Sequence, residues 1–302
     1  MTVIAAPQEL DEPLYPAYMP TLTNEIFPEH EPFEHDDPAS RADPTFPNLL
    51  GSKAVAKPVT PLFGSEICGI QLTELSPEGL DELGLLVAQR GFAVFRNQNW
   101  KDSGFKKQLD IARHFGPLHK HPVQPRPATE TEISVIYQSA AEVRRINYWG
   151  NRVSGVNWHA DQTYERQPPA VTFFGVLENQ GWCGGDTIIG DALRREAINT
   201  SHPLVTRHPV TGDEVLFVNE VFTTSIEGMK VEESDNLLRF LFAYIARGAD
   251  FQARVKWEEG TVILWDQRRA QHSATLDTPH DRRRHMIRIT PLGGRPIPAT
   301  RK

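Results

Sequence analysis

His159 and Asp161 lie two residues apart in the segment Asn157-Trp158-His159-Ala160-Asp161, and both have side chains that bind metal ions. Successive side chains of an extended strand point to opposite faces, so these two would lie on the same face. With a second imidazole, they would form the 2-His-1-carboxylate triad that suits Fe(II) and leaves coordination positions open. Such pairs also occur by chance on polar surface strands, so the interpretation depends on residues further along the chain.

His272 could supply the second imidazole. It follows an apolar segment, residues 261–265, and the residues Asp266-Gln267-Arg268-Arg269 that come after it. The chain contains 11 histidines, so this choice needs support from other residues. That support comes from the basic segment that follows.

Residues 282–290 have the alternation of a strand with one aliphatic side. Ile287 and Ile289 would face the core, which places Arg284 and Arg288 on the other face. A guanidinium group can form two parallel hydrogen bonds with a carboxylate or a sulfonate. An exposed basic strand is the alternative, and it is less favoured beside a metal site.

Apolar patterns predict the elements that would position these residues. A helix is expected after Ser76-Pro77-Glu78, an N-cap followed by proline at the first helical position, and should end at Gly91. Two more helices are expected at about residues 102–115 and 237–248. Short strands are expected at residues 92–95, 133–137, 157–161, 171–177, 215–219 and 261–265. This pattern predicts a mainly β fold with flanking helices, such as a jelly roll or barrel.

Composition excludes several classes of protein. The 302 residues have no run of 18 apolar side chains and no signal peptide, so we expect a soluble, cytoplasmic protein that binds no membrane. Two cysteines, Cys68 and Cys183, provide no disulfide framework. The net charge of −7 is concentrated in residues 1–50, where ten acidic side chains accompany only Arg41. The rest of the chain has no basic stripe, which excludes a nucleic-acid partner.

The N-terminal segment, residues 1–56, differs in composition from the rest. Its first fifty residues hold nine prolines between acidic and aromatic residues, with no sustained helical or alternating period. We expect an arm that packs on the domain formed by residues 57–302 or on a neighbouring subunit. A disordered tail is the alternative.

Four motifs of the chain, in order, resemble the signature of the taurine/2,4-D dioxygenase (TauD/TfdA) family of Fe(II)/2-oxoglutarate-dependent dioxygenases. They are His159-x-Asp161, Gly184-Gly185-Asp186-Thr187, Trp265-Asp266 with His272, and Arg284 with Arg288. The resemblance runs from about residue 59 to residue 296. The proline-rich arm and residues 249–257 are similar to the fungal sulfonate-dioxygenase branch in particular.

The resemblance implies a double-stranded β-helix, a cupin-like jelly roll, assembled as a homodimer or homotetramer. It implies Fe(II), with 2-oxoglutarate and O2 as co-substrates. The catalytic and metal-binding residues would be His159, Asp161 and His272. Thr187 and Arg284 would bind the distal carboxylate of 2-oxoglutarate.

The same resemblance implies a site for the charged end of a small anionic substrate. His121, Phe222 and Arg288 match substrate-binding positions of the sulfonate members. Gln124 stands where the taurine enzyme has an aromatic hydroxyl, and Gln162 follows the metal ligand where a small aliphatic residue is expected. These two glutamines make the predicted pocket more polar than the pocket for taurine.

Three functions are compatible with these residues. The first is oxidation of an alkyl sulfonate, with release of sulfite, succinate and carbon dioxide. The second applies the same chemistry to an amino acid or other small carboxylate, with hydroxylation, desaturation or ring closure in natural-product biosynthesis. The third is a non-catalytic, cupin-like binding protein. The complete metal triad together with Arg284 argues against the third.

The family usually has a longer segment between Thr187 and His202, with helices and a lid over the substrate. Here Asp191-Ala192-Leu193 leads almost directly into Arg194. Either the protein lacks this lid or a stretch near residues 191–196 is missing from the numbering. We expect the second, because the sequence from Arg194 onward resembles the far side of the usual segment.

Overall fold

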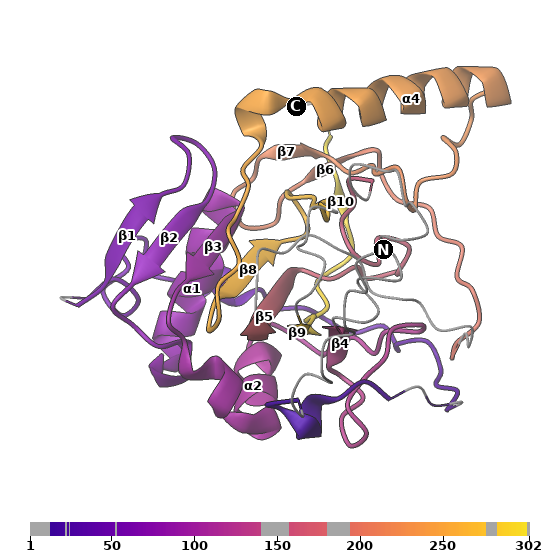
Figure 1. The fold of residues 1–302 in the computed structure, drawn as a ribbon. Coiled ribbons are helices and arrows are strands. Elements are labelled where there is room, and N and C mark those ends of the chain that lie inside the picture. The colour runs from indigo at the N-terminus through magenta and orange to yellow at the C-terminus, as the bar shows by residue number, and fades with distance from the viewer. Residues whose placement is uncertain are drawn as a thin grey trace, which may run out of the picture.

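A computed structural model of the protein describes residues 13–21, 23, 25–51, 53–139, 157–179, 194–275 and 283–300. Most strands in this part of the chain form a seven-stranded sheet in the order β1-β2-β3-β8-β5-β9-β4 (Figure 1). Neighbours are antiparallel, except that β2 and β3 are parallel. The bounds are β1 Val55–Pro58, β2 Ser65–Cys68, β3 Phe92–Phe95, β4 Ser134–Gln138, β5 Val171–Asn179, β8 Val262–Asp266 and β9 Arg284–Ile289.

A second, smaller sheet has three antiparallel strands in the order β10-β6-β7. Its strands are β6 Val205–Arg207, β7 Glu214–Leu216 and β10 Ile297–Pro298. The fold is thus mainly sheet with few helices, as the sequence predicts. The expected strand at residues 215–219 is displaced, because β7 already ends at Leu216.

Two helices, α1 (Pro77–Arg90) and α2 (Gly104–Arg113), cover one face of the large sheet. Ser76 caps α1 as expected, since its hydroxyl accepts a hydrogen bond from the Gly79 nitrogen at 3.2 Å. Gly91 ends α1 with φ at 80°, a left-handed conformation that glycine adopts without strain. Apolar side chains of both helices join those of β3, β5, β8 and β9 in the main core.

The opposite face of the large sheet carries a smaller apolar cluster. It contains alternate residues of the same strands, such as Phe92, Phe174, Ile263 and Met286. Because strand side chains alternate, the sheet separates a helix-covered core from a second face. The second face lines the cavity of the candidate active site.

Residues 157–161 do not form the predicted strand. Only His159 makes a β-bridge, with His272, and a turn begins at Asp161. Gln162 has φ at 49°, which breaks the extended conformation directly after Asp161. The prediction of a strand here was therefore wrong, although its consequence that His159 and Asp161 face the same point holds.

The N-terminal segment contacts the rest of the chain at several places. Tyr18 is buried, and its hydroxyl donates to the Gln108 side chain of α2 at 3.1 Å. The carboxylate of Glu82 in α1 accepts hydrogen bonds from the backbone nitrogens of Asn48 and Leu49 at 2.9 and 2.7 Å. Contacts with both helices hold the described part of this segment against the body.

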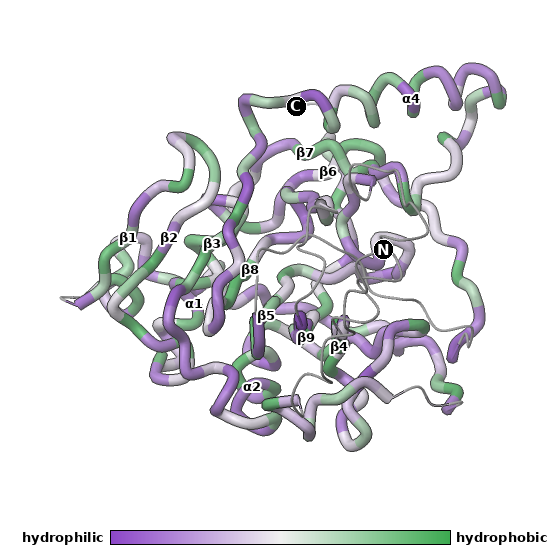
Figure 2. The backbone as a smooth tube through the Cα atoms, in the orientation of Figure 1, coloured by the Kyte–Doolittle hydropathy of each residue, from purple (hydrophilic) through white to green (hydrophobic). Residues whose placement is uncertain are grey.

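A long helix, α4 (Val231–Arg247), runs along one side of the molecule (Figure 1). Hydrophobic and hydrophilic residues alternate along it (Figure 2). Leu238 is buried, whereas Phe240 and Tyr244 are 64% and 58% exposed. None of the helices in the described ranges is both long enough and apolar enough to cross a membrane.

Candidate active site

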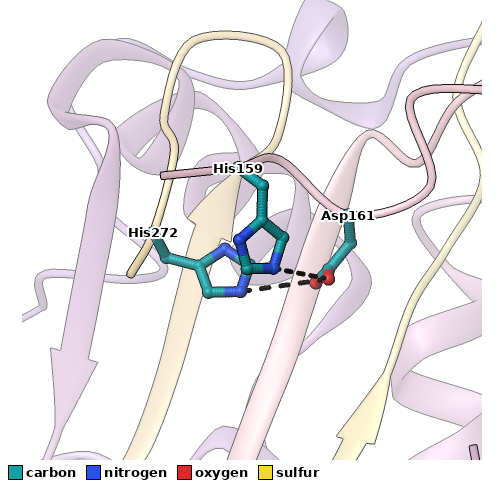
Figure 3. Close-up of side chains that lie close together, drawn as sticks. All are labelled: His159, Asp161 and His272. Carbon is teal, nitrogen blue, oxygen red and sulfur yellow. Dashed lines mark ion pairs between the residues drawn. The ribbon is translucent and has the colours of Figure 1, made fainter. Parts of the chain in front are cut away.

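The triad predicted from the sequence comes together in the structure (Figure 3). The backbones of His159 and His272 exchange two hydrogen bonds of 3.0 and 2.8 Å. The Nε2 atoms of His159 and His272 lie 3.8 and 3.9 Å from Oδ1 of Asp161. All three ligand atoms lie within 4.8 Å of one another. In the described part of the chain, no other group of three such side chains could share a metal ion.

Hydrogen bonding fixes the side of the imidazole that His159 presents to Asp161. Nδ1 of His159 lies 2.8 Å from the carbonyl oxygen of Asn157, which can only accept, so Nδ1 carries the proton. Nε2 is therefore the nitrogen directed toward Asp161, and it is the atom that could bind a metal in the neutral imidazole. Two imidazoles and one carboxylate are a donor set that suits Fe(II).

The protonation states also favour metal binding. Burial lowers the pKa of His272 to about 3, so its imidazole is neutral at neutral pH. Burial alone would favour the neutral acid of Asp161. The charge of Arg288, the neighbouring His272 and His159 and the hydrogen bond from Gln267 together outweigh burial and hold the pKa of Asp161 below its usual range. The site therefore offers a neutral imidazole and an ionised carboxylate, the forms that bind a metal.

Arg284 and Arg288 project from β9 toward the cavity, on the face that the alternation predicts. Each residue is only 5% exposed. Nη1 of Arg288 donates to Oδ1 of Asp161 at 2.7 Å, and Nη2 donates to Oε1 of Gln124. Nε of Arg284 contacts the sulfur of Met286 at 3.0 Å. Two buried guanidinium groups thus face the space beside the triad, where an anion would complement them.

The cavity next to the triad has a volume of about 1640 Å³. Aromatic rings form much of its wall, including Phe92, Phe174, Trp257 and Trp265. The predicted co-substrate and substrate residues that line it are His121, Gln124, Gln162, Phe222, Arg284 and Arg288. The structure therefore gathers these six around the triad. Thr187 lies outside the described residues.

His121 presents a neutral hydrogen-bond donor. Its Nδ1 accepts hydrogen bonds from the backbone nitrogens of Val123 and Gln124 at 3.2 and 3.1 Å, so the proton is on Nε2. Burial lowers the pKa of His121 well below its ordinary value. The Phe222 ring lies edge-on to the ring of His159, with 6.2 Å between centroids. The chemistry available here is hydrogen bonding to an anion beside an aromatic wall.

Gln162 is strained and buried. It is 2% exposed, has φ at 49°, and its Oε1 has no hydrogen-bond partner within the described chain. Non-glycine residues with positive φ are uncommon and concentrate at functional sites. Its position on the cavity wall agrees with the predicted place beside the substrate.

Sequence reasoning missed two sets of residues near the triad. Gln267 makes hydrogen bonds to both the backbone and the carboxylate of Asp161. A buried ion-pair network joins Glu165 to His119 at 2.8 Å and to Arg195 at 2.5 Å. The partners are far apart in the chain, so no local pattern could indicate either contact. Gln267 directly follows the Trp265-Asp266 motif in the sequence, which was the only local signal for it.

Comparison with known proteins identifies relatives along most of the chain. The family described as "Taurine catabolism dioxygenase TauD, TfdA family" matches residues 56–195 and 191–290. The alpha-ketoglutarate-dependent dioxygenase cnsM of Penicillium expansum is 43% identical over 96% of this chain and 92% of its own length. The alpha-ketoglutarate-dependent sulfonate dioxygenase of Saccharomyces cerevisiae is 38% identical over 94% of this chain and 79% of its own.

Among solved structures, a taurine dioxygenase from Burkholderia xenovorans has a similar fold. Its TM-score is 0.61 at 24% sequence identity, and the match covers 82% of this chain and 93% of that one. This likeness concerns the fold alone.

The comparisons also bear on the segment near residues 191–196. The alignment with cnsM spans 333 positions but uses 96% of the 302 residues, so roughly 40 positions face gaps in this chain. The two family matches meet at residues 191–195, which places a break in the family pattern there. The expectation that a stretch is missing near residues 191–196 stays a prediction.

The family match spans residues 56–290, and two relatives above 30% identity cover more than nine tenths of the chain. The structure brings His159, Asp161 and His272 together as a potential metal site. The chain belongs to the TauD, TfdA family and is an Fe(II)- and 2-oxoglutarate-dependent dioxygenase that uses O2.

Proposed function

We propose that the protein oxidises a C–H bond of a small anionic substrate, and that this substrate is an alkyl sulfonate. The observation that carries the proposal is the position of Arg288, a buried guanidinium beside the metal-binding triad and on the cavity wall. Oxidation at the carbon that bears sulfur would release sulfite, with succinate and carbon dioxide from the co-substrate. The 38% identity to a sulfonate dioxygenase supports this choice.

His159, Asp161 and His272 would hold Fe(II), and Arg284 with Thr187 would bind the distal carboxylate of 2-oxoglutarate. When bound, these cofactors supply the activation of O2 that C–H oxidation needs. The described protein groups would bind and orient the metal, the co-substrate and the substrate. Asp161 and His272 keep the charge states that bind a metal, and the burial of Arg284 strengthens its pairing with a carboxylate.

Arg288 and the Nε2–H of His121 would bind the charged end of the substrate. Phe222 would bound the space above His159, and Gln124 and Gln162 would contact the remainder of the substrate. An anion held between Arg288 and His121 would place the neighbouring carbon toward the triad. Orientation of this kind contributes strongly to rate, because the reacting C–H bond is already held in place.

An anaerobic titration tests this proposal. The protein with Fe(II) and 2-oxoglutarate is mixed with alkyl sulfonates and, separately, with carboxylates of matched length. A perturbed visible absorption band with the sulfonates, followed by sulfite release on addition of O2, is expected. Turnover of the carboxylates alone would overturn the sulfonate proposal.

A small carboxylate, such as an amino acid in natural-product biosynthesis, is the second candidate. Two observations favour it. Gln124 is hydrogen-bonded to Arg288, which makes the anion site more polar. The cavity of about 1640 Å³ is also larger than a short sulfonate would fill. The oxidation would then hydroxylate, desaturate or close a ring. Arg288 can pair with either anion.

We further propose that the two sheets form a double-stranded β-helix, a cupin-like jelly roll, in residues 57–302, with residues 1–56 as an arm. The likeness to the taurine dioxygenase fold supports this architecture. A homodimer or homotetramer remains our proposal for the assembly.

A further inference from the structure

Gln267 is the first residue after β8 and is 3% exposed. Its side chain makes three hydrogen bonds, and two of them reach Asp161. Oε1 accepts from the backbone nitrogen of Asp161 at 3.0 Å, and Nε2 donates to Oδ2 of Asp161 at 3.1 Å. Nε2 also donates to the hydroxyl of Thr172 at 2.7 Å. One amide thus fixes both the main chain and the carboxylate of a metal-binding residue.

The two carboxylate oxygens of Asp161 have different neighbours. Oδ2 accepts the hydrogen bond from the amide of Gln267. Oδ1 accepts from Nη1 of Arg288 at 2.7 Å and is the oxygen that faces Nε2 of His159 and Nε2 of His272, at 3.8 and 3.9 Å. A carboxylate that binds through one oxygen uses one coordination position, and one that binds through both oxygens uses two. With two histidines in an octahedron, only the first arrangement leaves three positions open for a bidentate co-substrate and O2.

We propose that Gln267 is a positioning residue that holds Asp161 as a one-oxygen metal ligand. This inference rests on the proposed metal site. Gln267 does not touch the metal or the substrate; it acts through Asp161 by occupying Oδ2 and fixing the carboxylate plane. Hydrogen-bonding partners of ligating carboxylates commonly set metal affinity in this way.

The surroundings of Gln267 explain why it can do this. Its backbone nitrogen donates to the carbonyl oxygen of Ala170 at 2.9 Å, directly before β5 begins. Thr172 belongs to β5, which pairs with β8 along its length. Gln267 is therefore anchored to the rigid sheet at two points. Asp161 lies in a turn outside any strand, so its position depends on this bridge to the sheet.

A buried glutamine could instead serve packing alone, and the chain offers a matched control. Gln167 is 8% exposed, and its side chain makes three hydrogen bonds: with the nitrogen and oxygen of Phe33 at 3.0 Å each, and with the oxygen of Gly293 at 3.3 Å. Removing its amide should affect stability as removing that of Gln267 does. It should not affect a metal ligand.

The test is an anaerobic titration with Co(II) alone, followed by its d–d absorption, on wild-type protein and the variants Gln267→Leu and Gln167→Leu. Gln267→Leu should weaken Co(II) binding about 10- to 100-fold and change the spectrum, because the carboxylate is free to rotate onto two-oxygen binding. Gln167→Leu should keep both the affinity and the spectrum of wild type, even where its melting temperature falls.

Thr172→Val provides a milder variant if Gln267→Leu does not fold. It removes only the hydrogen bond that orients the amide, and should weaken Co(II) binding in the same direction by less. Unchanged affinity and spectrum in the folded Gln267 or Thr172 variant would overturn the positioning role. Wild-type protein that bound no Co(II) would overturn the proposed metal site itself, and with it the role of Gln267.

Discussion

Arg288 acts on Asp161 both through a hydrogen bond and through its charge. It is the main positive charge that opposes the effect of burial on the pKa of this carboxyl group. The same guanidinium is the group proposed to bind the substrate anion. In this proposal, one residue links the charge state of the proposed metal ligand to the occupancy of the proposed substrate site.

Replacement of Arg288 by glutamine should make metal binding more sensitive to acid. In wild type the pKa of Asp161 is lowered, so the carboxylate persists as the pH falls. Without the guanidinium, burial raises that pKa, and the carboxylate is lost at a higher pH. Arg288→Gln should bind Co(II) more weakly than wild type, and the difference in affinity between the two proteins should be larger at about pH 5 than at about pH 8. The same ratio at both pH values would show that Arg288 does not control this group.

Replacement of Arg284 by glutamine should instead weaken the binding of 2-oxoglutarate. Loss of a desolvated, charge-assisted pair costs about 2–5 kcal/mol, which corresponds to at least a roughly 30-fold rise in Kd. Isothermal titration with 2-oxoglutarate and a redox-inert metal measures this. In the Arg284 variant, the affinity for metal alone should depend on pH as it does in wild type. This result would distinguish the role of Arg284 from that of Arg288. Loss of 2-oxoglutarate binding in the Arg288 variant only would mean that their roles are reversed.

At the scale of elements, an ion-pair network fastens the N-terminal segment to the end of β8. Arg268 pairs with Asp37 of that segment and with Asp266, the last residue of β8. His208 also contacts Asp266, at 3.0 Å. Asp266 and Gln267 are neighbours in sequence, so this network lies directly beside the bridge to the metal site.

Asp37→Asn should destabilise the protein by about 1–3 kcal/mol at neutral pH, because it removes a charged hydrogen-bond acceptor from Arg268. Burial opposes ionisation of Asp37, but hydrogen bonds from His35 and Arg268 and the charge of Arg268 lower its pKa. Its contribution is thus fully present above the unfolded pKa and should disappear as the pH falls through the folded one. Chemical denaturation at several pH values measures the difference.

Asp36→Asn is the control for that experiment. Asp36 is the preceding residue and pairs with Arg41, but its side chain is 78% exposed. Surface pairs of this kind contribute about 0–1 kcal/mol. An equal loss of stability in both variants would contradict a specific role for Asp37.

At the scale of the whole molecule, the parts that follow local periodicity were predictable. The alternation of residues 284–289 fixes which side chains share a face, because strand side chains have a period of two. The cap at Ser76 and the stop at Gly91 fix α1 in the same local way. The motif spacing also selected the three side chains that the structure brings together as a potential metal site.

What the sequence did not reveal depends on contacts between distant segments. Side chains of residues 157–161 alternate as in a strand, yet only His159 pairs with another segment, through its β-bridge to His272. The chain turns after Asp161, because Gln162 has a left-handed conformation. The bridge from Gln267 to Asp161 spans 106 residues, and the pair between His119 and Glu165 spans 46. Such pairings are set by how sheets and turns assemble, and no local pattern records them.

The most direct test of the account is formation of the Fe(II)–2-oxoglutarate complex without oxygen. Wild-type protein should develop the weak visible charge-transfer band of that chelate, because the triad leaves two adjacent positions for the co-substrate. Asp161→Ala and His159→Ala should show no band and no 2-oxoglutarate turnover. A band that persists in either variant, or its absence from iron-loaded wild-type protein, would contradict the assignment of this site.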